Sequence, residues 1–265
     1  MGKSEKKGLW KRIVSALILA PLVLGAIYHG WTTTLMLVLV VGTILAWEWA
    51  EMVPNNNNSV YALTYQAALF ITTAFIYPWY IGYPLAFILI ATLFVWWKAK
   101  GEKHRRLLTL GVPYISLGIG AIVWLYTWIS PIAALWLIVA VWGVDVGGYL
   151  VGTTVKGPKL APKISPNKTW SGLLGAIIFS VLISWGFAHY VIPERSLLVV
   201  ASGAVLAVVA QCGDLLESKI KRYLQIKDSS NLIPGHGGMF DRVDGLIFAA
   251  PFVLLWCVLL IYIAG

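Results

Sequence analysis

The sequence predicts an all-α, polytopic integral membrane protein with about nine transmembrane helices. First, 59% of the 265 residues are apolar and only 12% are charged, with a mean hydropathy of +0.80. Second, apolar runs of about 20 residues, long enough to cross a bilayer as helices, recur along the chain. Third, basic residues collect in alternate connections between these runs, which is typical of membrane proteins.

The apolar runs give the expected helices in order. They cover approximately residues 12–29, 31–52, 59–77, 79–97, 107–129, 131–152, 169–192, 196–215 and 243–264. The first run follows basic residues, but no small-residue cleavage pattern follows it, so we expect a retained helix and not a removed signal peptide.

The basic residues predict the orientation of these helices. They cluster at 3–12, 98–106, 156–168 and 219–242, whereas Arg195 lies on the other side. With nine spans, the positive-inside rule places the N-terminus in the cytoplasm and the C-terminus outside. We therefore assign the formal charge of +9 to membrane orientation and expect no nucleic-acid partner.

Acidic residues indicate where function is concentrated, because every aspartate follows residue 140. We expect one membrane domain over 1–265, in which 1–130 are mainly scaffold helices and 140–245 form the functional region with its cytoplasmic loops.

Asp145 lies about two turns, roughly 10 Å, from the cytoplasmic end of its span. A carboxylate at that depth is costly, so it is expected to face a cavity, with a structural hydrogen bond as the alternative. The glycines around it could serve helix packing.

Two further segments carry charges suited to anions and cations. We expect "KLAPKISPNKTWSG", residues 159–172, to be a cytoplasmic loop that its two prolines stiffen, and Thr169 or Asn167 can cap the next helix. Lys163 and Lys168 would lie near its positive end and could form an anion site, or simply obey the positive-inside rule.

The second segment is "GDLLESKIKRYLQIKD", residues 213–228, at the end of the eighth apolar run. If this segment is helical, one face carries four polar residues at i, i+3, i+4 and i+7, which are Asp214, Glu217, Ser218 and Lys221. A solvated helix end with ion pairs is the alternative.

The segment "NLIPGHGGMFDRVDG", residues 231–245, precedes the last apolar run. If the last helix begins near Asp241, this residue is a natural N-cap and Asp244 is at N3, so both could serve capping alone. Glycines beside His236 permit positive φ and close approach of a ligand. Taken together, carboxylates suited to Mg²⁺, basic residues suited to phosphate and a glycine-rich loop predict phosphoryl or nucleotidyl transfer at the cytoplasmic membrane surface.

The motif from Ser218 through Asp244 resembles that of phosphatidate cytidylyltransferases, also called CDP-diacylglycerol synthases. The segments around Asp145 and residues 161–172 are similar to other stretches of this family. The resemblance implies an Mg²⁺-dependent reaction of CTP with phosphatidate to CDP-diacylglycerol and pyrophosphate. It also implies a homodimer and a bacterial cytoplasmic (inner) membrane location, with the active site facing the cytoplasm.

The same resemblance implies roles for individual residues. Asp214 and Asp241 would be the main metal carboxylates, joined by Asp244, and a monovalent cation such as K⁺ could share the site. Lys168 and Asp145 would be catalytic residues together with Asp214 and Asp241. The remaining candidates would bind the phosphates of the two substrates, and they are Lys163, Ser218, Lys221, Arg222, Lys227, His236, Gly237, Gly238 and Arg242. We expect His236 to support the loop or contact a phosphate, not to act as the base.

Two other functions are compatible with the sequence. One is a related CTP-dependent membrane enzyme that acts on another lipid, such as an isoprenoid phosphate or alcohol. The other is a transporter, which the sequence disfavours because such folds often show two similar halves, whereas the aspartates here are confined to one half.

Overall fold

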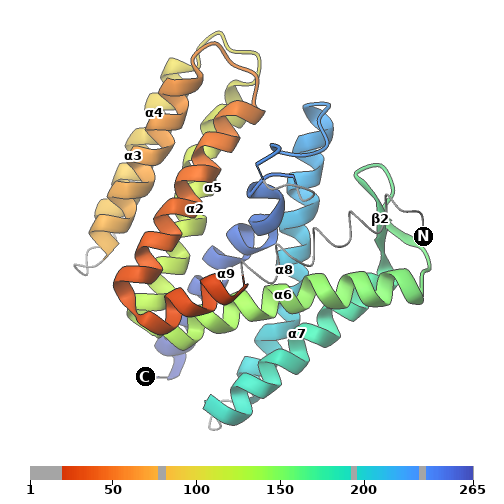
Figure 1. Ribbon diagram of the computed structural model, residues 1–265. Helices are drawn as coiled ribbons and strands as arrows, with labels where there is room; N and C mark the ends of the chain where they lie inside the picture. The colour runs from red at the N-terminus through yellow and green to blue at the C-terminus, as the bar shows by residue number, and fades with distance from the viewer. Residues whose placement is uncertain (1–19, 77–81, 192–195, 233–236, 265) are drawn as a thin grey trace. The chain divides into compact units, whose positions relative to one another are not determined.

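Helices dominate the structure, a computed structural model that describes residues 20–76, 82–191, 196–232 and 237–264 (Figure 1). A helix over Ala20–His29 comes first. The following helices are α2 Trp31–Met52, α3 Asn58–Ile76, α4 Gly82–Lys98, α5 Arg105–Trp124 with the π-helical turn η1 Leu125–Ile129, α6 Pro131–Thr154, α7 Trp170–Val191, α8 Ser196–Tyr223 and α9 Phe240–Ala264. A short antiparallel hairpin, β1 Lys159–Ala161 and β2 Ser165–Thr169, lies between α6 and α7. The all-α fold class is confirmed, with this hairpin added to it.

Six of the described helices are long and apolar enough to cross a membrane. These are α2, α5 with η1, α6, α7, α8 and α9. The helix α4 has 17 residues, fewer than the roughly 20 that a span usually needs, and the predicted first span is described only from Ala20. The structure therefore supports a helical membrane protein, while the number nine and the orientation of the termini stay predictions.

The chain forms two compact units. The first consists of Met1–Trp128 and Asp228–Val243, and the second of Ile129–Lys227 and Asp244–Gly265. In the first unit, α3 packs against α2, α4 and α5. Two buried aromatic side chains tie these helices to α5, since Trp49 Nε1 donates to the carbonyl of Leu107 at 3.0 Å and Tyr65 Oη donates to that of Leu108 at 2.7 Å.

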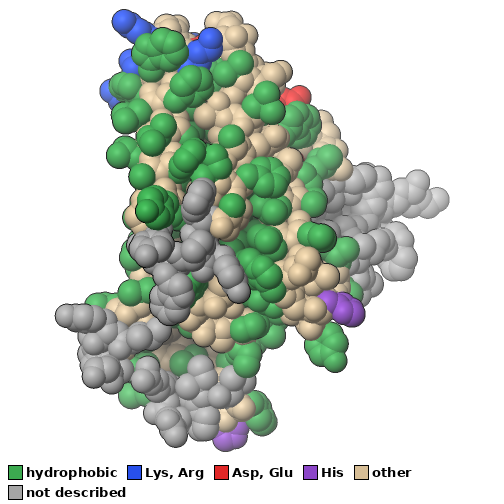
Figure 2. Space-filling view, turned by 90° about the vertical axis from the view of Figure 1, so that its left-hand side faces the viewer, with side chains coloured by type: hydrophobic (Ala, Val, Ile, Leu, Met, Phe, Trp, Pro, Cys, Tyr) green, Lys and Arg blue, Asp and Glu red, His purple; other side chains and the backbone are tan. Residues whose placement is uncertain are grey.

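The outer surface of α4 is apolar. Its exposed large side chains include Tyr83, Leu85, Phe87, Leu89, Ile90, Leu93, Phe94, Trp96 and Trp97. Figure 2 shows a face of the molecule on which hydrophobic side chains predominate, with Lys and Arg side chains gathered at one end. Apolar patches of this extent are rare on soluble monomers, so the surface indicates contact with lipid.

Close helix packing organises the second unit. A Cβ atom on Gly147 of α6 would lie 2.6 Å from the carbonyl oxygen of Gly175 on α7, and the reverse distance is also 2.6 Å. Only glycine allows the two backbones to approach in this way. The glycines around Asp145 therefore serve the packing of α6 against α7, as the alternative explanation expected. Ser180 of α7 then bonds to the carbonyl of Gly203 on α8 at 2.7 Å.

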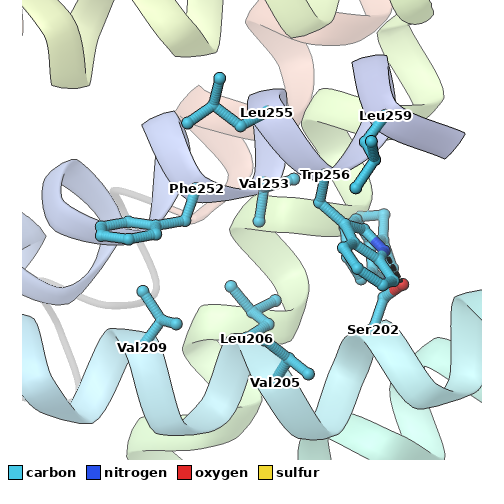
Figure 3. A pocket seen from close by; sticks show the side chains of 10 residues that line it. Ser202, Val205, Leu206, Val209, Phe252, Val253, Leu255, Trp256 and Leu259 are labelled. Carbon is cyan, nitrogen blue, oxygen red and sulfur yellow. Dashed lines mark hydrogen bonds between the residues drawn. The ribbon is translucent and has the colours of Figure 1, made fainter. Parts of the chain in front are cut away.

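An apolar cavity of about 240 Å³ lies between α8 and α9, with Trp136 of α6 also in its wall. In Figure 3, Val205, Leu206 and Val209 of α8 face the side chains of α9. Two residues of the cavity wall form a hydrogen bond, in which Trp256 Nε1 donates to Ser202 Oγ at 2.7 Å. The composition of this wall suits hydrocarbon and offers little to a charged ligand.

Candidate active site

A charged cavity of about 640 Å³ opens within the second unit. Its wall contains both signs of charge: two aspartates, Asp145 of α6 and Asp214 of α8, and three lysines, which are Lys156, Lys159 and Lys168. Asp145 is exposed to this cavity, as the cost of burying a carboxylate in a membrane helix led us to expect. Its part in a reaction stays a prediction.

The β1–β2 hairpin carries two of these lysines. The sequence predicted a proline-stiffened loop here, but the segment pairs as strands, with Lys159 opposite Thr169 and Ala161 opposite Ser165. Thr169 Oγ1 accepts the amide of Gly172 at 3.0 Å, so Thr169 caps α7 as expected. The strand β2 therefore delivers Lys168 immediately before a capped helix start.

The start of α7 supplies less to an anion site than the sequence suggested. The amide of Gly172 is used by the cap, and the amide of Trp170 donates to the carbonyl of Pro158 at 3.1 Å. The lysine side chains are therefore the main positive groups of this cavity.

Lys168 forms an ion pair with Asp214. The exposed fractions of the two side chains are 16% and 32%, so the pair is partly shielded from solvent. It connects the hairpin to the middle of α8, and thereby brings together two residues that are 46 positions apart in the sequence. Both were predicted as site residues.

The predicted polar face of α8 is present, because the helix continues to Tyr223, beyond the predicted apolar run. Lys221 Nζ lies 2.7 Å from Glu217 Oε2, and Ser218 Oγ lies 3.4 Å from Asp214 Oδ1. Glu217 is 2% exposed and Lys221 is 9% exposed, so this is not a fully solvated helix end. The alternative of a solvated face with ion pairs is wrong for these two residues.

Asp214, Glu217 and Asp244 form a three-carboxylate cluster, in which one oxygen of each residue lies within 4.8 Å of the others. Glycines on both helices permit this approach. A Cβ on Gly213 would lie 3.0 Å from the carbonyl oxygen of Asp244, and one on Gly245 would lie 3.2 Å from that of Ala210. Three carboxylates at this spacing repel one another, and Lys168 and Lys221, which form ion pairs with Asp214 and Glu217, offset part of this negative charge. Hard oxygen ligands in this number fit Mg²⁺.

The glycine-rich loop belongs to the first unit, and Gly237 has a φ of +81°, as the sequence predicted for this loop. The helix α9 begins at Phe240, one residue before Asp241, so Asp241 is not its N-cap. The carboxylate of Asp241 instead accepts the amides of Gly238 at 2.8 Å and Ser229 at 3.1 Å. The aspartate thus closes the loop that precedes it.

The start of α9 is capped by Glu48 of α2. This carboxylate is fully buried and accepts the amides of Met239 at 2.8 Å and Phe240 at 2.7 Å. The sequence does contain an indication that Glu48 has partners, because it is an acid inside an apolar helix, where ionisable residues are usually paired. The prediction that residues 1–130 are mainly scaffold did not include it, because that prediction followed the aspartates, and none lies in this part of the chain.

Of the remaining predicted residues, most are exposed, one is buried and one lies outside the described residues. Lys163 is exposed in the hairpin turn and is not part of the cavity wall, whereas Lys156 and Lys159, which the sequence argument did not select, line it. Arg222 and Lys227 are exposed, and Arg222 Nη1 bonds to the carbonyl of Ile226 at 3.2 Å. Gly238 is buried, Arg242 is exposed, and His236 lies outside the described residues.

Known proteins resemble this chain over most of its length. Residues 10–260 match the model of the cytidylyltransferase family. A phosphatidate cytidylyltransferase of Brucella suis is 32% identical over 255 residues, covering 94% of this chain and 93% of the relative. The protein of that name from Pseudomonas aeruginosa is 34% identical over 274 residues, covering 94% and 97%. That from Rickettsia typhi is 31% identical over 255 residues, covering 93% and 91%.

Proposed function

The chain belongs to the cytidylyltransferase family, and we propose on this premise that it makes CDP-diacylglycerol and pyrophosphate from CTP and phosphatidate in phospholipid biosynthesis. The observation that carries the proposal beyond family membership is the charged cavity, whose wall holds three lysines and two aspartates, which are Lys156, Lys159, Lys168, Asp145 and Asp214. Asp214 also belongs to the three-carboxylate cluster. One site thus combines groups for phosphate with groups for a divalent cation.

The reaction joins two phosphates. A phosphate oxygen of phosphatidate forms a bond to the α-phosphorus of CTP, and the bond from that phosphorus to the bridging oxygen of the β-phosphate breaks. The bond electrons leave with pyrophosphate. Because the second pKa of a phosphate monoester is about 6, the attacking oxygen is largely ionised near neutral pH, and a strong general base is unnecessary.

Charge is the main obstacle, because one polyanion must approach another. In our proposal the lysines of the cavity bind phosphate oxygens, lower their mutual repulsion and hold them in line for attack. Lys168 is central to this proposal, because it lines the cavity and forms an ion pair with Asp214, which belongs to the carboxylate cluster. Ser218, Lys221 and Arg222 follow on α8, and we propose that they, with Lys163, Lys227, His236, Gly237, Gly238 and Arg242, complete the binding of the two substrates.

Asp214, Glu217 and Asp244 would hold Mg²⁺, since their oxygens are hard ligands within 4.8 Å of one another. When bound, Mg²⁺ neutralises developing charge on the transferred phosphate and on the leaving pyrophosphate. We propose Asp241 as a further metal carboxylate and a monovalent cation such as K⁺ as a second ion, both on the basis of the family resemblance.

The lipid substrate explains the membrane setting. We propose that the cavity holds the phosphate of phosphatidate at headgroup depth, that its acyl chains stay in the bilayer, and that CTP enters from the cytoplasm. In this proposal the protein has nine spans and lies in a bacterial inner membrane as a homodimer, with a cytoplasmic N-terminus and active site. The basic connections at 98–106 and 156–168 support the orientation. A cysteine introduced at Lys103, in a chain whose Cys212 and Cys257 are replaced by alanine, should react with an impermeant thiol reagent only from the cytoplasmic side.

Pyrophosphate release from CTP tests the function directly. Purified protein with Mg²⁺ should release pyrophosphate when phosphatidate is added and form CDP-diacylglycerol in equal amount. Isoprenoid phosphates and alcohols should give little product. A clear preference for an isoprenoid substrate would establish the alternative enzyme, and substrate uptake into proteoliposomes without CTP consumption would establish a transporter.

A further inference from the structure

Glu48 binds both ends of the segment between Ser229 and Phe240. At one end its carboxylate accepts hydroxyl hydrogen bonds from Ser230 at 2.5 Å and Ser229 at 3.4 Å. At the other end it accepts the amides of Met239 and Phe240. An ionised carboxylate has about four lone-pair sites, so this single group is saturated with donors from one segment.

The surroundings of Glu48 leave little room for another arrangement. The side chain is fully buried, and the adjacent Trp49 packs against Phe240 with ring centroids 5.3 Å apart. A Cβ on Gly238 would lie 2.6 Å from Glu48 Oε1 and would overlap the hydroxyl of Ser229. The negative charge also lies at the N-terminus of α9, where the helix dipole favours it. These contacts hold the two described ends of the segment, at Ser229–Ser230 and at Met239–Phe240, on α2.

Asp241 follows directly after the residues that Glu48 holds. Its own carboxylate accepts the amides of Ser229 and Gly238, so both acids bind the same segment from within the first unit. We propose that Glu48 is a positioning residue for Asp241, acting through the amides of Met239 and Phe240. This inference deepens the proposed function and rests on it, because Asp241 is the residue proposed there as a metal carboxylate.

The variant Glu48→Gln separates this role from a general need for a charge. Glutamine keeps the size of the side chain but replaces one acceptor oxygen with an NH₂ group, and a backbone amide cannot reverse its direction to suit it. Glu51→Gln is the matched control, because Glu51 is exposed on the same helix and the change removes the same charge.

Hydrogen exchange in the Mg²⁺-free protein gives a readout that does not depend on activity. The amides of Met239 and Phe240 should exchange about tenfold faster or more in Glu48→Gln, and at the parent rate in Glu51→Gln. Exchange in Glu48→Gln at the rate of the control would overturn the proposal. This result is independent of whether the parent protein uses CTP.

Kinetic measurements then distinguish the positioning of Asp241 by Glu48 from an effect of Glu48 on folding. In Glu48→Gln, kcat should fall by about 10- to 100-fold and the Mg²⁺ concentration for half-maximal rate should rise, while KM for phosphatidate changes by no more than about threefold. An unchanged kcat and Mg²⁺ dependence would overturn the inference, as would a rate loss that only matches a loss of folded protein. A parent protein without pyrophosphate release would instead refute the proposed function.

Ser230→Ala keeps the inference testable if Glu48→Gln does not fold. This change removes one of the four donors and leaves the carboxylate and both amides in place. It should produce the same pattern with a smaller effect, of about two- to tenfold in exchange rate and in kcat. A parent-like exchange rate and Mg²⁺ dependence in Ser230→Ala would count against the inference.

Discussion

Glu48 in the first compact unit and the three-carboxylate cluster in the second are both acidic sites within apolar helices, and they differ in their partners. Glu48 is surrounded by four hydrogen-bond donors. In the cluster, Asp214, Glu217 and Asp244 lie within 4.8 Å of one another, and Lys168 and Lys221 form ion pairs with Asp214 and Glu217. A carboxylate saturated by backbone and hydroxyl donors supports structure, whereas carboxylates gathered together require a cation. Their partners, and not the residue type, separate the two roles.

The largest expected effect is in the cluster. Asp214→Asn should lower the rate of pyrophosphate release by about a thousandfold, because it weakens metal binding and breaks the ion pair with Lys168. Thermal unfolding in detergent should change little, since the repulsion between the acids is reduced at the same time. Activity with ordinary Mg²⁺ dependence, or a variant that does not fold, would contradict the assignment of this site.

Opposite effects on stability should distinguish the two acidic sites. In Mg²⁺-free protein, Glu48→Gln should cost about 1–3 kcal/mol, because a buried amide loses its acceptor. Asp244→Asn should leave the unfolding temperature unchanged or raise it, because it removes one of three adjacent negative charges. Thermal unfolding of both variants, monitored by circular dichroism, measures the difference. Equal destabilisation by both changes would remove the distinction.

Gly238→Ala tests the loop side of the Glu48 contacts. The added methyl group would overlap Ser229 Oγ and crowd Glu48, at a cost of about 1–3 kcal/mol. Gly186→Ala is the control, because a Cβ there meets no atom within 4 Å and alanine favours the helix. The expected result is a lower unfolding temperature and lower activity for Gly238→Ala only. Similar values for both variants would show that the loop adjusts freely.

The smallest expected effect lies at the apolar cavity, away from both acidic sites. Ser202→Ala removes the hydrogen bond from Trp256 Nε1 and should cost about 0.5–1.5 kcal/mol. The rate of pyrophosphate release at a temperature well below unfolding should stay at the parent value. A large loss of activity would mean that this apolar region takes part in the reaction, and that the charged groups alone do not define the site.

Much of the architecture could be predicted from the sequence. Apolar runs and the placement of basic residues predicted a helical membrane protein, because the bilayer demands long apolar helices whatever their packing. The spacing of Asp214, Glu217, Ser218 and Lys221 predicted one polar face of α8, because positions three and four apart adjoin in any α-helix. The glycine beside His236 was expected to adopt positive φ, and Gly237 does.

Only the tertiary structure decided which of these residues meet. The pairing of Lys168 with Asp214 depends on the β1–β2 hairpin. The prolines in this segment led us to predict a loop instead. The place of Asp244 beside Asp214 depends on the close packing of α8 and α9 at Gly213 and Gly245.

Glu48 shows most clearly what a single sequence does not predict. Its partners are about 180 to 190 positions away in the sequence, as the separations of 181, 182, 191 and 192 residues show. Local patterns set helix type and helix faces because those interactions are local in the chain. The choice of partners between helices depends on how the helices pack and on contacts between residues far apart in the chain, which a single sequence does not display.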